Sequence, residues 1–214
     1  MSKQQATDLA ESPQPPPAVE HKPWRHAGTS PRAVAVFIAV MAVMLAGDLA
    51  LKYVSFAHVA DRPVENVAEA AEDADAFWQR YPHQPVDLIP GVLSLRLTTN
   101  TGAVFGWAAG SQWLFIIVSI VACGVIVYLF VRSRAEAWLM HVALALILAG
   151  ALCNLYDRLR YAAVRDMLWL FPETGLWPYI FNLADAALMV GVITVIALTW
   201  WHELRQRGAE STAG

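Results

Sequence analysis

Four long apolar stretches constrain the fold of this chain more than any other feature of its sequence. Each has about the 20 residues that a helix needs to cross the hydrocarbon core of a bilayer. They are residues 33–56, 113–131, 137–156 and 179–201. The 214-residue chain is 57 % hydrophobic and only 15 % charged, which excludes an ordinary soluble domain. We therefore predict an all-α membrane protein with four transmembrane helices, which together form one domain over residues 33–201.

The charges outside these stretches predict how the helices are oriented. Basic residues are expected on the cytoplasmic side of a membrane. They precede the first stretch, separate the second from the third and follow the fourth: Lys22, Arg25, Arg32, Arg132, Arg134, Arg205 and Arg207. The segment 57–112 has seven acids and three arginines, which suits the outer side. Four alternating spans also place the link 157–178 outside, although it carries three arginines that need another explanation: Arg158, Arg160 and Arg165.

The remaining regions suggest little chemistry. Residues 1–32, which include the run PQPPP, are predicted to be a disordered cytoplasmic head, and residues 202–214 a cytoplasmic tail. A cleaved signal peptide is the less favoured interpretation of the first stretch, because its apolar run is too long and cleavage would discard Asp48 and Lys52. Cys123 and Cys153 lie in apolar stretches, and the histidines lack metal-ligand spacing. We expect no disulfide, metal or cofactor.

Polar residues gather where the predicted spans reach the outer face. In chain order these residues are Asp48, Lys52, Asn100, Gly102, Asn154, Asp157, Arg158, Asp166, Asn182 and Asp185. The spacing of Asp48 and Lys52 predicts a self-contained ion pair on one helix face, with the lysine extending toward the interface. Asn154, Asp157 and Arg158 predict a network at the end of the third helix, in which the aspartate fixes the arginine.

Asp185 is harder to explain structurally. It lies six residues into its predicted span, and no lysine or arginine lies within a helical turn of it. Such a carboxylate needs a partner from elsewhere in the chain, and Asp166 is the nearest unassigned acid on the same side. Two carboxylates in one site cannot both ionise easily, so one keeps a proton while the other draws a proton from water, as in aspartic hydrolases. From the residues alone, proton or ion transport and structural pairing stay open as alternatives.

Five motifs, in order along the chain, resemble those of the signal peptidase II (lipoprotein signal peptidase) family. They are GDLALK, NTGAVFG, AGALCNLYDR, VRDML and FNLADAALMVG, and they span most of residues 48–191. The resemblance implies an intramembrane aspartic endopeptidase in which Asp166 and Asp185 are the catalytic pair. It also implies substrate-binding or supporting roles for the following residues: Asp48, Lys52, Asn100, Gly102, Asn154, Asp157, Arg158, Asn182 and Ala184.

The resemblance gives several of these residues a specific role. Asn182 would position the catalytic pair or the substrate backbone, and Ala184 would leave room beside it. Asn154 and Arg158 would contact the substrate, with Asp157 holding Arg158 in place. The first-helix residues and Asn100 would support the pocket from its other side.

The reaction implied is hydrolysis of one peptide bond of a bacterial prolipoprotein, just before the cysteine that carries a diacylglyceryl group. It would take place near the outer face of the bacterial cytoplasmic (inner) membrane, without metal or cofactor. The implied partners are the lipid-modified prolipoprotein and membrane lipid, with no nucleic acid, and the family favours a monomer. The alternative function is a non-enzymatic four-helix membrane protein, either a small transporter or an inactive scaffold. The apolar inner halves of the spans argue against a transporter.

Some positions depart from the family pattern. Residues 49–51 are Leu, Ala and Leu where the family has polar residues, so we expect different packing at that end of the pocket. Ala149 and Cys153 stand where the family has glycines, so we expect looser helix packing near them.

The outer segment 57–112 has two predicted parts. Alternating residues over 93–98 predict a strand, within a small β-region over the active site at about residues 86–107. Before it, residues 65–81 read as a short acidic helix. We favour a solvated decoration, with a lid as the alternative, in which Phe77, Trp78 and Tyr81 would dip into the membrane interface.

Overall fold

The structure is a computed structural model that describes residues 25–102, 112–172 and 174–213, without the side chains of 209–213. Most of the predicted head therefore lies outside the described residues, as does the end of the motif that begins at Asn100. Five α-helices, two short 3₁₀ helices and four strands make up the described fold. In chain order they are η1 (Ala27–Thr29), α1 (Pro31–His58), η2 (Val67–Ala71), α2 (Ala74–Arg80), β1 (Val86–Ile89), β2 (Leu93–Asn100), α3 (Gln112–Arg132), α4 (Trp138–Tyr161), β3 (Val164–Leu170), β4 (Ile180–Phe181) and α5 (Leu183–Ala213).

Four of these helices are long and apolar enough to cross a membrane, as predicted. They are α1, α3, α4 and residues Leu183–Gly208 of α5. The helix α4 is central, since it packs against α1, α3 and α5. Large apolar side chains such as Val43, Trp113 and Ile193 are exposed on the outside of the bundle. Exposed apolar surface of this kind is expected where lipid takes the place of water.

Two helix boundaries differ from the prediction and change the position of the polar residues. The helix α4 continues to Tyr161, so Asn154 and Asp157 lie inside it, and it ends where Ala162 adopts a left-handed conformation with φ of 58°. The helix α5 begins at Leu183, because the two residues of β4 before it pair with β3. Asp185 therefore lies in the first turn of its helix and not six residues into it.

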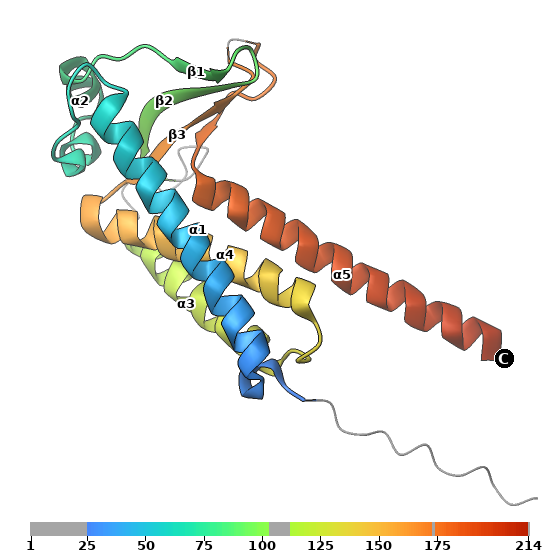
Figure 1. Cartoon of the computed structure of the whole chain (residues 1–214). Helices are drawn as coiled ribbons and strands as arrows, with labels where there is room; N and C mark the ends of the chain where they lie inside the picture. Colours follow the sequence, from blue (N-terminus) through green and yellow to red (C-terminus); the bar gives the residue numbers. More distant parts are fainter. Residues whose placement is uncertain (1–24, 103–111, 173, 214) are drawn as a thin grey trace, which may run out of the picture.

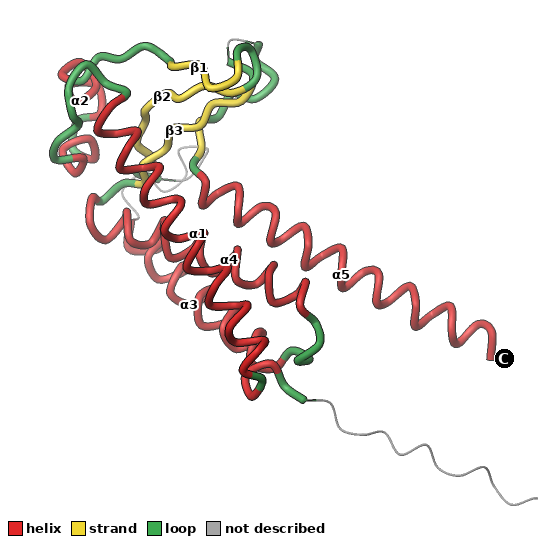
Figure 2. Tube along the Cα trace, in the orientation of Figure 1, coloured by secondary structure: helices red, strands yellow, loops and turns green. Residues whose placement is uncertain are grey.

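A four-stranded antiparallel sheet with the order β1-β2-β3-β4 covers one end of the bundle (Figures 1 and 2). The strand β2 confirms the strand predicted at residues 93–98. Its buried side chains, Ser94 and Leu97, do not follow the predicted alternation, because the register shifts between Leu95 and Thr98. The strand β3 was not predicted: residues 164–170 were expected to be part of a link over the helix ends. Asp166, the third residue of β3, pairs with Thr98 of β2, and the register of the two strands shifts between this pair and the pair of Leu168 with Leu95. Residues 103–107 of the predicted β-region lie outside the described residues.

The acidic part of the outer segment folds as two short helices and not as one. Asn66 has a left-handed conformation before η2, and Asp73 caps α2 by accepting a hydrogen bond from the amide of Ala76. Phe77 and Tyr81 are buried in a cluster that also contains Phe56 and Met167. These aromatic residues therefore join the acidic helices to α1 and to the sheet, which argues against their dipping into the membrane interface.

The helices α4 and α5 approach closely at two glycines. A Cβ atom added to Gly150 would lie 2.5 Å from the carbonyl oxygen of Ala184, and one added to Gly191 would lie 2.7 Å from the carbonyl oxygen of Ala143. Cys153 is also buried, with its thiol 4.0 Å from the carbonyl oxygen of Leu45. The expectation of looser packing here was therefore wrong, because the single glycine at position 150 already permits backbone contact.

We expect Gly150→Ala to destabilise the protein by about 1–3 kcal/mol, because the new methyl group would meet backbone that cannot rotate away. Thermal unfolding in detergent measures this effect. The matched control is Gly124→Ala in α3, where an added Cβ meets nothing within 4 Å. An unfolding midpoint for Gly150→Ala as high as that of Gly124→Ala would contradict close packing of α4 against α5.

Candidate active site

Asp166 and Asp185 lie at the end of the bundle that the sheet covers, and Asn182 connects them. The Nδ2 atom of Asn182 donates to Oδ1 of Asp166 at 2.6 Å. Its Oδ1 atom accepts from the amide of Asp185 at 2.9 Å, while the amide of Asn182 donates back to Oδ2 of Asp185 at 3.4 Å. This reciprocal pair is a capping box, which satisfies amides at the start of α5. The same residue thus starts the helix and positions both carboxylates.

Asn154 forms a second connection, from the opposite helix. Its Nδ2 atom donates to Oδ1 of Asp185 at 2.7 Å, and its Oδ1 atom accepts from Nδ2 of Asn182 at 3.2 Å. Both oxygens of Asp185 therefore accept hydrogen bonds, one from Asn154 and one from the amide of Asn182. Hydrogen bonds donated to a carboxylate stabilise its ionised form. These two hydrogen bonds favour the ionised form of Asp185, whereas its burial opposes that form.

Asp166 has the opposite tendency. Asp166 lies on β3 and is only 2 % exposed. Burial, and after it the negative charge of Asp185, raise the pKa of Asp166 to about 8, against the lowering effect of the hydrogen bond from Asn182. Asp166 is therefore mostly protonated at neutral pH. The site thus contains one carboxyl group that keeps its proton and a second one that accepts hydrogen bonds on both of its oxygens.

A chain of buried charges supports this pair from α1 and α4. The Nζ atom of Lys52 lies 2.8 Å from Oδ2 of Asp48 and 3.0 Å from Oδ2 of Asp157, and all three side chains are completely buried. Lys52 also donates to Oδ1 of Asn154 at 3.3 Å. The predicted ion pair of Asp48 and Lys52 is thus confirmed. However, it is not self-contained, and the lysine points into the protein and not toward the interface.

The last member of this chain of buried charges is Arg165, which the sequence analysis did not identify as a site residue. Its Nε and Nη2 atoms donate to Oδ1 of Asp157 at 3.2 and 2.8 Å, and its amide donates to Oδ2 at 3.0 Å. Two acids and two bases therefore neutralise one another: Asp48, Lys52, Asp157 and Arg165. The prediction that Asp157 holds Arg158 was wrong in this respect. Adjacent helix residues do not face each other, whereas β3 returns the side chain of Arg165 to the aspartate. In the sequence, one feature indicated a special role for Arg165: it belongs to the link 157–178, whose arginines are unexpected on the outer side of the predicted topology.

The other predicted residues lie around this core. Asp48 reaches across to α5, where its Oδ1 accepts from the amide of Ala184 at 2.9 Å, and Ala184 is fully buried against Gly150. The guanidinium of Arg158 lies over the ring of Phe115 at 5.3 Å, and the charges of Asp185 and Asp166 act on it.

Asn100 and Gly102 lie further along β2. Asn100 is the last residue of the strand, and its Oδ1 accepts from the amide of Gly102 at 3.2 Å. The described contact of its side chain is thus with its own turn, while its backbone pairs with Val164 of β3.

Comparisons with known proteins identify the family to which this fold belongs. The family model described as signal peptidase (SPase) II matches residues 38–201. A lipoprotein signal peptidase of Desulfitobacterium hafniense is 38 % identical over 127 residues, which are 59 % of this chain and 82 % of that protein. One of Latilactobacillus sakei is 48 % identical over 108 residues, which are 50 % of this chain and 70 % of that protein.

Solved structures give the same result for the fold. One, described as a bacterial membrane enzyme at 2.3 Å resolution, aligns with a TM-score of 0.61 at 26 % identity and covers 78 % of this chain and 88 % of its own. The family match, the relatives and the shared fold together lead to one conclusion: the chain belongs to the signal peptidase II family.

Proposed function

We propose that Asp166 and Asp185 are the catalytic pair with which this chain removes signal peptides from bacterial prolipoproteins. The observation that carries the proposal is the unequal environment of two linked carboxyl groups. Asn182 and Asn154 tie both groups to one hydrogen-bonded frame, while burial keeps Asp166 protonated and two hydrogen-bond donors favour the ionised form of Asp185. Paired carboxyl groups with opposite protonation states can supply a general acid and a general base at once.

In the proposed mechanism, Asp185 takes a proton from a water molecule, whose oxygen attacks the carbonyl carbon of the scissile bond. Asp166 gives its proton to the carbonyl oxygen as the tetrahedral intermediate forms. When this intermediate collapses, Asp185 returns its proton to the leaving amine and Asp166 recovers a proton from the hydroxyl group. One water is consumed, and both aspartates regain their starting states. Asn182 and Asn154 hold the two groups throughout, and no metal or cofactor takes part.

The substrate proposed from the family is a prolipoprotein cleaved before its diacylglyceryl-modified cysteine. The four apolar helices make the chain a multi-pass protein of a bacterial membrane. We place the sheet and the catalytic pair at the outer face of the cytoplasmic membrane and both termini in the cytoplasm. Basic residues predominate in the segments at the opposite end of the bundle, whereas segment 57–112 beside the sheet has seven acids and three arginines. A signal helix within the bilayer would then present its cleavage site at the catalytic pair. We propose that the chain works as a monomer, without nucleic acid.

The direct test is a processing assay. The full-length chain, purified in detergent, is mixed with a diacylglyceryl-modified prolipoprotein, and release of the signal peptide is followed by mass spectrometry. Cleavage before the modified cysteine is the expected result. A transporter or an inactive scaffold would leave the substrate intact.

The processing rate is expected to fall as the pH rises through about 8, because Asp166 must be protonated to act as the acid and loses its proton above its pKa. The measurement is kcat/KM as a function of pH. In Asn182→Ala the hydrogen bond that lowers the pKa of Asp166 is lost, so the alkaline limb of the remaining activity should move to higher pH. An alkaline limb that stays in place in this variant would contradict the assignment of the acid.

A further inference from the structure

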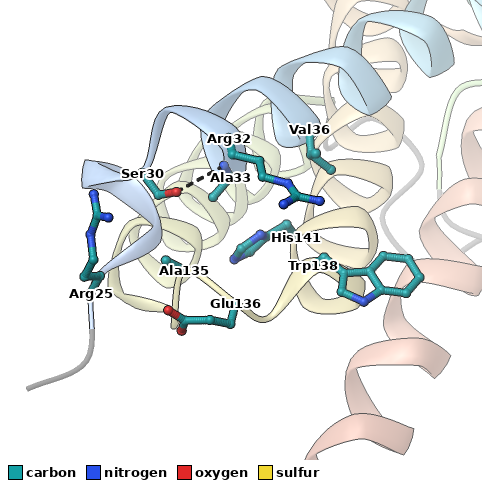
Figure 3. A pocket seen from close by; sticks show the side chains of 9 residues that line it. All are labelled: Arg25, Ser30, Arg32, Ala33, Val36, Ala135, Glu136, Trp138 and His141. Carbon is teal, nitrogen blue, oxygen red and sulfur yellow. Dashed lines mark hydrogen bonds between the residues drawn. The ribbon is translucent and has the colours of Figure 1, made fainter. Parts of the chain in front are cut away.

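A pocket lies at the end of the bundle opposite the catalytic pair, and nothing in the proposed reaction uses it. It has a volume of about 420 Å³ and opens between the starts of α1 and α4. Two arginines, Arg25 and Arg32, line it together with Trp138, His141 and Glu136 (Figure 3). The rest of its lining is small or apolar: Ser30, Ala33, Val36 and Ala135.

The backbone around this pocket is fixed. The residues before α1 form an antiparallel bridge with the link between α3 and α4, in which the amide of Ala27 donates to the carbonyl of Ser133 and the amide of Ala135 donates to the carbonyl of Arg25, both at 2.9 Å. His141, which is only 1 % exposed, has its Nε2 atom 3.1 Å from the carbonyl oxygen of Arg134. Arg25 and Arg32 are therefore presented from a built framework.

The electrostatics of the pocket favour an anion. Among the described residues, the ion pairs do not involve the guanidinium of Arg25 or of Arg32. The helices α1 and α4 both begin at the pocket, and neither has an acid in its first turn. The partial positive charge of two helix N-termini thus adds to that of the two arginines, and Glu136 is the one acid in the lining.

The position of the pocket identifies the anion. Pro31 and Trp138 are the first residues of two membrane spans, so the opening lies at the level of the lipid headgroups. Trp138 is 61 % exposed, as expected for an aromatic residue at the membrane interface. Next to the arginines, Ala33 and Val36 continue the wall along the apolar face of α1, where an acyl chain can lie. A free phosphate ion would need no such wall.

We infer that this pocket binds the phosphate group of an anionic phospholipid, with Arg25 and Arg32 as its ligands. In the orientation proposed above, the pocket faces the cytoplasmic leaflet, where basic pockets between transmembrane helices recognise anionic headgroups. The inference concerns lipid binding alone, so it stands whether or not Asp166 and Asp185 prove to be catalytic.

The test uses the full-length chain in detergent, titrated with phosphatidylglycerol or with phosphatidylcholine, with the bound lipid counted by native mass spectrometry. We expect phosphatidylglycerol to bind more tightly, and Arg25→Gln and Arg32→Gln to weaken its binding about fivefold each. The matched control is Arg132→Gln, which removes a positive charge from the same end of the bundle but not from the pocket. Glu136→Gln should strengthen binding, because it removes the competing acid, and it gives a result even where an arginine variant folds poorly.

Three outcomes would overturn the inference. Equal affinity for the two lipids would show that the headgroup charge is not recognised. A loss in Arg132→Gln as large as that in Arg32→Gln would show a general surface effect. Displacement of phosphatidylglycerol by millimolar inorganic phosphate would assign the pocket to the free ion. Processing of prolipoprotein should stay unchanged in all these variants, since none of the residues lies near the catalytic pair.

Discussion

Asp166→Asn and Asp185→Asn are each expected to reduce prolipoprotein processing by at least about a thousandfold. General acid and general base catalysis each contribute about 10²–10⁴-fold, and the asparagine side chain can neither supply nor accept the required proton. Both substitutions keep the size of the side chain. An amide at position 185 would also turn one of the two acceptor oxygens into a donor, opposite Asn154 or the amide of Asn182. Single-turnover cleavage of a diacylglyceryl-modified substrate measures the effect.

Two controls make this result specific. Asp61→Asn removes an exposed acid from the same end of the bundle and should leave the rate unchanged. The double variant of Asp166 and Asp185 should be about as inactive as either single variant, because residues that act as one unit are not additive. Cleavage within tenfold of the native rate in either single variant would refute its catalytic role, and an inactive native chain would refute the enzyme assignment.

Lys52→Met is expected to destabilise the protein by about 3–5 kcal/mol, because it leaves the carboxylates of Asp48 and Asp157 buried with one fewer cation. Thermal unfolding in detergent reports the loss. Processing should fall as well, since Lys52 also positions Asn154, which contacts Asp185. The expected damage would thus reach the proposed catalytic pair through two hydrogen bonds.

A second substitution tests the cause. Adding Asp48→Asn to Lys52→Met removes both charges of one pair and leaves Asp157 with Arg165, so part of the lost stability should return. Arg80→Met is the control for an exposed pair: Arg80 and Glu69 are 53 % and 39 % exposed, so its loss should cost no more than about 1 kcal/mol. Equal costs for Lys52→Met and Arg80→Met would show that the buried charges are not coupled as described.

The acidic helices of the outer segment were predicted less well than the membrane spans. The spans follow from apolar length alone, because a bilayer demands about 20 residues in helix whatever the rest of the chain does. The break between η2 and α2 depends on one left-handed residue, Asn66, and on the cap at Asp73, which are weak signals within an acidic run. The burial of Phe77 against Phe56 is a contact between distant segments, which no local pattern contains.

The sequence by itself determined the four membrane spans, the strand at residues 93–98 and, through the resemblance of its motifs, the two aspartates proposed as the catalytic pair. These follow from length, alternation and residue order, which are properties of the chain before it folds. Only the tertiary structure decided that Arg165 and not Arg158 pairs with Asp157, and that Lys52 is buried between two acids. The reason is geometric. A buried charge takes whichever partner the packed backbone brings within hydrogen-bonding distance, and here β3 pairing with β2 and α4 packing against α1 set those distances.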